Sequence, residues 1–187
     1  MTATALLLSA GFLFGASVPK DIAKSNSVVI ETSMGTIEVE LFPEKAPKTV
    51  ANFLKYTDDG FFDGLTFHRV IPNFMIQGGG HDKAMALKKA REPIVNESAN
   101  GLLNVRGTIA MARTAEPDSG TSQFFINTKD NEFLDFANDK PGYCVFGKVT
   151  KGMDVVDKIS AVEKGIVAGH NDVPTEPVVL KTVRRGK

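Results

Sequence analysis

Residues 66–80 read Thr66-Phe67-His68-Arg69-Val70-Ile71-Pro72-Asn73-Phe74-Met75-Ile76-Gln77-Gly78-Gly79-Gly80. The first six are rich in β-branched and aromatic residues and predict a strand, Thr66 to Ile71, that Pro72 ends. Phe74 to Gln77 predicts a second short strand, which three glycines end.

The rest of the chain repeats this pattern of short apolar segments separated by turn residues. Helical spacing of apolar residues predicts one helix within Pro43 to Gly60, with Pro47 at its first position, and another at Lys151 to Val162. Residues 81–97 are charged and weakly periodic and predict a loop. Further strands are predicted at Val28 to Thr32, Thr36 to Leu41, Gly107 to Ala112, Ser122 to Asn127, Tyr143 to Val149 and Pro177 to Val183. We therefore expect a mainly β fold, a closed eight-stranded antiparallel barrel capped by two α-helices.

Length and composition suit one soluble domain. The chain has 187 residues, of which 42% are hydrophobic and 24% charged, and its formal net charge is zero. No basic stripe suggests nucleic acid as a partner, and no acidic block suggests a solvating tail. Cys144 is the only cysteine, which excludes an intrachain disulfide and favours a buried small hydrophobe. We expect a monomer with its single domain at residues 18–187.

The first residues form an uncharged segment with an apolar middle, Ala5 to Ala16, ahead of Lys20. It is shorter than the roughly 20 residues that span a bilayer, but it matches the apolar region of a signal peptide. Gly15 and Ser17 suit a cleavage point near Val18, although Met1 to Thr4 carries no positive charge. We expect residues 1–17 to direct export to the periplasm, with no membrane insertion after processing. A buried N-terminal helix in a cytoplasmic protein is the alternative.

Several motifs of known chemistry are absent. Gly78-Gly79-Gly80 lacks the residues of a phosphate-binding loop, and residues 120–124 lack the final glycine of a nucleophile elbow. The three histidines, His68, His81 and His170, are far apart in the chain and show no metal-ligand spacing. We expect neither a metal nor a cofactor. No Ser–His or Cys–His set is discernible, which argues against a hydrolase.

Strand alternation allows two interpretations of Arg69 and favours one interpretation of His68. Phe67, Arg69 and Ile71 would share one face, so Arg69 is either an edge arginine reaching water or a cation at the rim of an apolar pocket. His68 would point the other way, as a buried, hydrogen-bonded structural residue.

The next strands place two glutamines beside large apolar side chains. Met75 and Gln77 would share a face opposite Phe74, and Gln123 would share a face with Phe125. Core packing is the ordinary role of such apolar residues, but pockets that hold an apolar group with a few placed polar groups also look like this.

Four segments, in order and spacing, resemble the cyclophilin family of peptidyl-prolyl cis/trans isomerases: Phe67 to Gly79, Gly107 to Ala112, Ser119 to Ile126, and Val145 to Val149. The resemblance extends over about residues 28–183. The stretches Ala112 to Ala115 and Phe133 to Asp135 look like the bacterial periplasmic branch.

The resemblance implies an enzyme that speeds rotation about X–Pro bonds of unfolded or partly folded polypeptides. Arg69 would be the catalytic arginine, and Gln77 and the backbone near Ala112 and Arg113 would hold the substrate main chain. The proline ring would bind against Phe74, Met75, Phe125 and Leu134. The alternative is a proline-peptide-binding module or holdase chaperone with little turnover, although a pure binder has no need of Arg69.

The sequence departs from the best-known eukaryotic members in the same region. Phe133 replaces a tryptophan, Tyr143 a histidine, Arg113 an asparagine and Thr114 an alanine. Because the family links cyclosporin binding to that tryptophan, we expect this chain to bind cyclosporin weakly. Asn73 replaces a common glycine and is expected to adopt a left-handed conformation, which asparagine tolerates.

Overall fold

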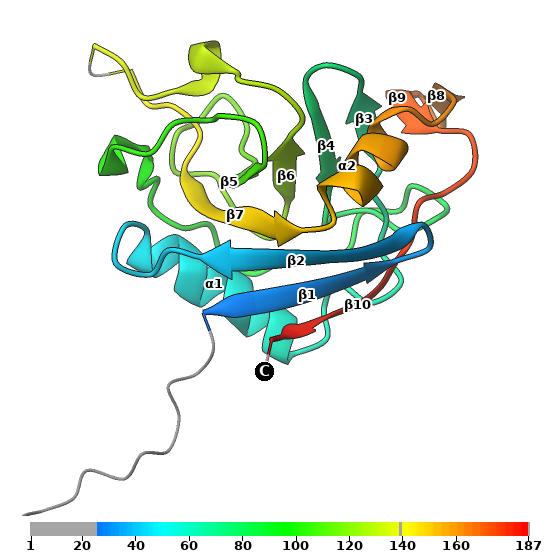
Figure 1. Cartoon of the computed structure of the whole chain (residues 1–187), viewed down its shortest axis with the longest axis horizontal. Helices are drawn as coiled ribbons and strands as arrows, with labels where there is room; N and C mark the ends of the chain where they lie inside the picture. Colours follow the sequence, from blue (N-terminus) through cyan, green and yellow to red (C-terminus); the bar gives the residue numbers. More distant parts are fainter. Residues whose placement is uncertain (1–25, 139, 187) are drawn as a thin grey trace, which may run out of the picture.

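The computed structural model describes residues 26–138 and 140–186 (Figure 1). The predicted signal peptide, residues 1–17, lies outside the described residues. The strands are β1 (Ser27–Thr32), β2 (Gly35–Leu41), β3 (Arg69–Ile71), β4 (Met75–Gly78), β5 (Thr108–Met111), β6 (Phe124–Asn127), β7 (Val145–Lys151), β8 (Lys164–Val167), β9 (His170–Pro174) and β10 (Leu180–Arg185). The helices are α1 (Pro47–Asp58) and α2 (Met153–Ser160), with short 3₁₀ turns η1 (Ser98–Asn100) and η2 (Glu132–Leu134).

The predicted eight-stranded antiparallel sheet and its two helices are confirmed. Its strand order is β10-β1-β2-β7-β5-β6-β4-β3, so β10 and β3 are its edge strands. Strands β10, β1, β2 and β7 lie one above the other in Figure 1. The residues just before the edge strands connect the edges. Phe67 N–H donates to the Val178 carbonyl at 2.9 Å, and Leu180 N–H donates to the Leu65 carbonyl at 2.7 Å. The barrel is therefore closed by irregular segments and not by pairing of β3 with β10.

The register of the sheet separates an inner from an outer face. Val70 pairs with Ile76, Ile76 with Ile126, and Ile126 with Ile109, across β3, β4, β6 and β5. All four side chains are fully buried. Since alternate residues of a strand point to opposite faces, their sequence neighbours form a matching row on the outer face.

Helix α1 packs against the inner face of the sheet through the aromatic ring of Phe53. The Phe53 ring lies 5.3 Å from that of Phe62, 5.4 Å from Phe124 and 5.2 Å from Phe146, measured between centroids. Pro47 begins the helix as predicted, and the free backbone N–H groups of Lys48 and Thr49 donate to the Glu97 carboxylate at 3.1 and 2.8 Å. The acid also stabilises the positive end of the helix dipole. No helix among the described residues is long and apolar enough to cross a membrane.

The hairpin of β8 and β9 was not predicted. Ala168 and Gly169, at its tip, have φ of 51° and 82°, as a two-residue type I′ turn requires. Only Val173 and Pro174 of these strands are buried, so the sequence carries almost none of the alternation that predicts strands. The hairpin lies beside β3 (Figure 1). Between β4 and η1 the chain forms no regular element, which confirms the loop predicted at residues 81–97.

Candidate active site

A row of four residues crosses the outer face of the sheet. Arg69 on β3 pairs with Gln77 on β4, Gln77 with Phe125 on β6, and Phe125 with Ala110 on β5. The inner-face isoleucines and Val70 are their immediate neighbours in the chain, so this row faces away from the main core. An arginine and a glutamine therefore lie directly beside an apolar surface.

That surface is a second, smaller apolar cluster. Met75, Phe125 and Leu134 are buried in it, and Phe74 and Tyr143 pack against it half-buried. Together they bound a depression of about 110 Å³, called the small pocket below. Nine predicted site residues line it: Arg69, Phe74, Met75, Gln77, Ala112, Arg113, Phe125, Leu134 and Tyr143. Drug-sized ligands use pockets of roughly 300–1,000 Å³, so this one fits a single small ring.

Arg69 brings an uncompensated charge to the small pocket. Its side chain is half-buried. Within residues 26–138 and 140–186, no carboxylate forms an ion pair with its guanidinium. Guanidinium groups carry five N–H donors in a fixed planar arrangement. Arg69 therefore offers donors to whatever occupies the small pocket.

Gln77 is oriented by a neighbour. Its side-chain nitrogen donates to the side-chain oxygen of Gln123 at 2.9 Å. Gly80 makes room for this arrangement, because a Cβ there would lie only 2.6 Å from the Gln123 side chain. The Ala112 N–H donates to the Gln123 backbone carbonyl at 3.0 Å. With its N–H engaged, Ala112 has only its carbonyl to offer a bound peptide.

Arg113 forms the opposite wall with Tyr143. Its guanidinium lies 4.5 Å from the centroid of the Tyr143 ring, and it donates to the carbonyls of Pro141 at 2.7 Å and Gly142 at 3.2 Å. The Tyr143 ring in turn meets the edge of Phe125 at 5.6 Å. Arg113 thus ties the segment before β7 to the loop that follows β5.

The remaining three predicted residues lie outside the small pocket. Thr114 and Gln123 line an adjacent depression of about 230 Å³, which shares Gln77, Ala112 and Arg113 with the small pocket. Phe133 lies at the rim, where 74% of it is exposed and its ring stacks on Phe74 at 5.5 Å. The structure thus brings the predicted residues into one region.

Comparison with known proteins identifies the family. The profile of cyclophilin type peptidyl-prolyl cis-trans isomerase/CLD matches residues 27–185. The chain belongs to the cyclophilin-type peptidyl-prolyl cis/trans isomerases. It is 53% identical to a peptidyl-prolyl cis-trans isomerase of Acinetobacter baylyi over 87% of either chain. It is 52% identical to peptidyl-prolyl cis-trans isomerase B of Escherichia coli, over 83% of this chain and 97% of that one.

Comparison with solved structures identifies the same family. A cyclophilin-type isomerase of Cryptosporidium parvum, crystallised in the presence of the dipeptide Ala-Pro, superposes with a TM-score of 0.68 at 25% identity. The match covers 86% of this chain and 99% of that one. The predicted family and isomerase activity are therefore confirmed for this cyclophilin.

Strand alternation failed at two positions of the cyclophilin. Phe67 was expected to share a face with Arg69, but it is fully buried in the main core, because β3 begins only at Arg69. Phe74 was expected opposite Met75, but both join the outer cluster. A turn precedes β4, in which Phe74 N–H donates to the Ile71 carbonyl at 3.2 Å. Asn73 in this turn has φ of 55°, which confirms its predicted left-handed conformation.

The histidines are the other correction. Far apart in the chain, they meet in space: the His68 and His81 rings lie 4.3 Å apart and the His81 and His170 rings 5.5 Å apart. His68 is buried as predicted, and its imidazole has hydrogen bonds with the Thr66 backbone and the Gln123 side chain. Its Nδ1 has no hydrogen-bond partner among the described residues. No three His, Cys, Asp or Glu side chains in the described part of the chain are placed to hold a metal ion together. The sequence contains no signal for this cluster, because the β8–β9 hairpin that brings His170 there was itself missed.

Cys144 belongs to the main core and is 3% exposed, as predicted for a single cysteine. Burial raises the pKa of its thiol to about 11, so the thiolate that acts as a nucleophile is not populated near neutrality. This is the packing role expected of a lone cysteine.

Proposed function

We propose that this cyclophilin isomerises X–Pro bonds with Arg69 as its catalytic cation and the small pocket as its proline-ring site. The observation that carries the proposal is the position of Arg69, half-buried beside Gln77 and an apolar cluster. No carboxylate of the described residues forms an ion pair with its guanidinium. A charge that leaves water without a partner costs free energy. A role in the reaction explains why the Arg69 guanidinium lies beside the small pocket.

The reaction breaks no bond. Resonance gives the peptide C–N bond partial double-bond character and a rotation barrier of about 18–20 kcal/mol. Uncatalysed X–Pro isomerisation therefore takes roughly 10–100 s at 25 °C. The enzyme has to bind the twisted amide more tightly than either planar form.

Arg69 discriminates between these states. In the twisted amide the proline nitrogen regains a localised lone pair, which accepts a hydrogen bond from the guanidinium. In the planar amide that pair is delocalised and accepts poorly. An interaction present only in the transition state lowers the barrier.

The other residues hold the substrate. Phe74, Met75, Phe125 and Leu134 grip the ring and exclude water, while Gln77 and the Ala112 carbonyl hold the main chain on one side of the rotating bond. Each tenfold acceleration requires about 1.4 kcal/mol, and a hydrogen bond to a charged group supplies about 1.5–3 kcal/mol. Arg69 would thus contribute one to two powers of ten, and desolvation and positioning the remainder.

A short Ala-Pro test peptide tests the proposal with wild type, Arg69→Ala and Arg69→Lys. We expect Arg69→Ala to lower kcat/KM by about ten- to a hundredfold with an unchanged melting temperature. Arg69→Lys keeps the charge without the planar donors and should fall between. Wild-type activity in a folded Arg69→Ala protein contradicts the assignment. A folded wild type that binds the peptide but does not turn it over favours the binding module or holdase.

We also propose that the clients are unfolded or partly folded polypeptides met in the periplasm by a monomeric enzyme. The apolar segment Ala5 to Ala16 supports export, and the open, shallow pocket supports extended chains as clients. The test is fractionation of expressing cells, with N-terminal sequencing of the mature protein. A new N-terminus near Val18 in the periplasmic fraction is expected, whereas intact Met1 in the cytoplasm contradicts export.

A further inference from the structure

A larger depression adjoins the small pocket. It has a volume of about 480 Å³, and we call it the histidine hollow. Arg69 and Gln77 line both cavities, so they form a shared wall between them. A peptide whose proline occupies the small pocket therefore brings its neighbouring side chains within reach of the histidine hollow.

All three histidines of the chain line this hollow. They come from three segments: His68 precedes β3, His81 follows β4, and His170 begins β9. His68 is only 6% exposed, and the buried Nδ1 atoms of His68 and His81 have no hydrogen-bond partner in the part of the chain that the structure describes. An unsatisfied buried polar atom costs about 1–3 kcal/mol, so folding stability does not explain the arrangement.

Backbone strain occurs at two residues of the same hollow. Met85 and Asp172 have φ of 62° and 59°, a conformation that costs of order 1–3 kcal/mol outside glycine and is concentrated at binding sites. Met85 is held there by the Asp82 carboxylate, which accepts from the N–H groups of Ala84 and Ala86 at 2.9 Å each. The unpaired Nδ1 atoms and the strained backbone therefore both cost folding free energy at the same cavity, which lies beside the proposed catalytic cation.

We propose that the histidine hollow is a second substrate subsite that binds an acidic side chain of the client polypeptide, close to its proline. The inference rests on the proposed binding of proline in the small pocket. The hollow offers mainly donors, from Arg69, the imidazoles and the Asn171 amide, and its lining includes one carboxylate, Asp172. A carboxylate is the acceptor that such a set of donors suits best.

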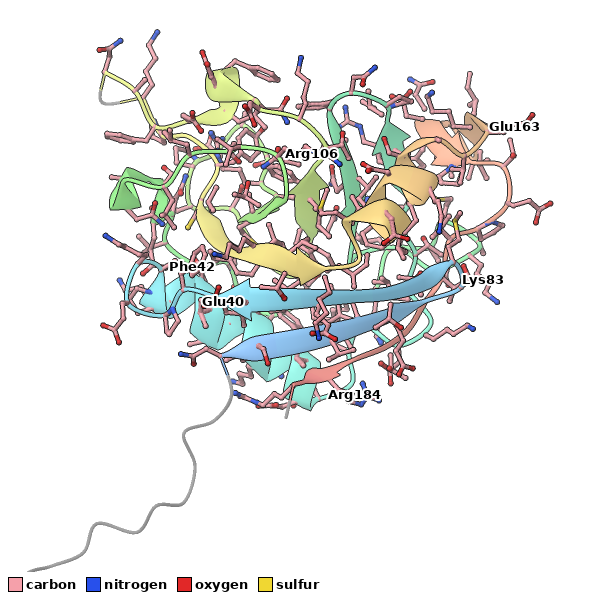
Figure 2. All side chains as sticks on the ribbon, in the orientation of Figure 1. Glu40, Phe42, Lys83, Arg106, Glu163 and Arg184 are labelled. Carbon is pink, nitrogen blue, oxygen red and sulfur yellow. The ribbon has the colours of Figure 1, made fainter. Side chains whose placement is uncertain are left out.

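The charges around the imidazoles make this subsite sensitive to pH. Arg69 and Asp172 lie in its lining, while Asp82 and Lys83 belong to the adjoining turn, at the same side of the molecule as Glu163, just before the hairpin (Figure 2). The charges of Arg69, Asp172, Asp82 and Lys83 sum to zero, and Glu163 adds one negative charge. Burial lowers the pKa of His81, and the nearby His170 lowers it further. An acidic client side chain would offset that repulsion, so its binding should take up protons and tighten as the pH falls.

Paired peptides test the subsite. In a short Ala-Pro peptide, each of the three positions on either side of proline is changed in turn to Glu or to Gln. Measured kcat/KM values give a Glu-to-Gln ratio for each position, at about pH 5 and about pH 8, because the pKa of His81 lies below the ordinary imidazole value of about 6.5. We expect one position at which Glu is preferred by about two- to fivefold, with the larger ratio at the lower pH.

Two variants and a control distinguish this subsite from general electrostatics. Asp172→Asn removes the opposing carboxylate while keeping a residue that tolerates positive φ, and it should raise the ratio by about two- to fivefold. His81→Gln removes the imidazole whose protonation the acidic side chain would favour, and it should abolish most of the pH dependence. Glu44→Gln removes an equal charge just before α1, whereas the hairpin lies on the opposite side of Figure 1, and it should leave the ratio unchanged.

A ratio near one at every position in wild type overturns the subsite, as does an equal response to Asp172→Asn and Glu44→Gln. If a folded wild type turns over none of the peptides, the proposed catalysis fails separately. Peptide affinities measured by calorimetry then decide the subsite, since tighter binding of one Glu peptide at the lower pH supports it and equal affinities refute it.

Discussion

The side chains of Gln77 and Gln123 are joined by a hydrogen bond of 2.9 Å, with Gln77 as the donor. Gln77 lines all three cavities of the outer face: the small pocket, the depression beside Thr114 and the histidine hollow. Gln123 lines the latter two but not the small pocket. We infer from this arrangement, as a proposal, that Gln123 acts on the substrate mainly by holding Gln77 in position.

That inference predicts strong coupling between the two glutamines. Gln77→Leu and Gln123→Leu should each lower kcat/KM by about two- to tenfold, as expected for one hydrogen bond of about 0.5–1.5 kcal/mol. The double variant should cost clearly less than the product of the two losses, because both single changes remove the same interaction. Steady-state kinetics of the four proteins measure the coupling. Independent, multiplicative losses would show that Gln123 acts on the substrate by itself.

Arg113 is predicted to affect substrate binding more than turnover. Arg113→Ala removes the contact with Tyr143 and the bonds to the Pro141 and Gly142 carbonyls, so one wall of the small pocket loses its support. A wall contacts the planar and twisted substrates alike, and loss of such uniform binding raises KM with little change in kcat. We expect a KM increase of about three- to tenfold, by analogy with one or two hydrogen bonds of about 1 kcal/mol. A fall in kcat at constant KM would assign Arg113 to the chemical step.

The small pocket was predictable from sequence because its residues lie on short, regularly alternating strands. Where alternation holds, as for Gln77 and Met75, the side chains occupy the expected face. It failed at Phe67 and Phe74, because the two strands begin three residues and one residue later than the pattern predicted, at Arg69 and at Met75. Periodicity indicates which residues are apolar, but hydrogen bonding decides where a ladder starts.

The histidine hollow was not predictable for a different reason. Its walls come from segments separated by up to about a hundred residues, and one wall is a hairpin whose exposed strands carry polar residues on both faces. Nothing local in the sequence requires His170 to approach His81. Only the closed sheet and the type I′ turn at Ala168 and Gly169 bring them together.

Replacing Phe133 with tryptophan is predicted to raise the affinity for cyclosporin. Phe133 is 74% exposed and stacks on Phe74, so a larger ring at this position would extend over the rim without displacing buried atoms. Because the cyclophilin family links cyclosporin binding to a tryptophan here, Phe133→Trp should bind cyclosporin more tightly than wild type and keep its kcat/KM. Fluorescence titration of the new tryptophan and inhibition of the wild type give the two affinities. Phe133→Leu is the matched control and should not gain affinity, and a Phe133→Trp protein no better than wild type would contradict the assignment.

The buried imidazole of His68 is predicted to make the free energy of unfolding depend on pH. Burial, followed by the nearby His81, lowers the pKa of its imidazole from 6.5 to about 4. The folded protein therefore holds His68 neutral where the unfolded chain is already protonated, so its contribution is favourable above pH 6.5 and is lost as the pH falls toward 4. A shift of this size corresponds to about 3 kcal/mol. Thermal melts at about pH 7.5 and pH 4.5 should show a smaller loss for His68→Gln than for wild type, whereas His170→Gln, which alters an exposed ring, should resemble wild type. Equal losses in wild type and His68→Gln would mean that other groups, such as the carboxylates, account for the acid sensitivity.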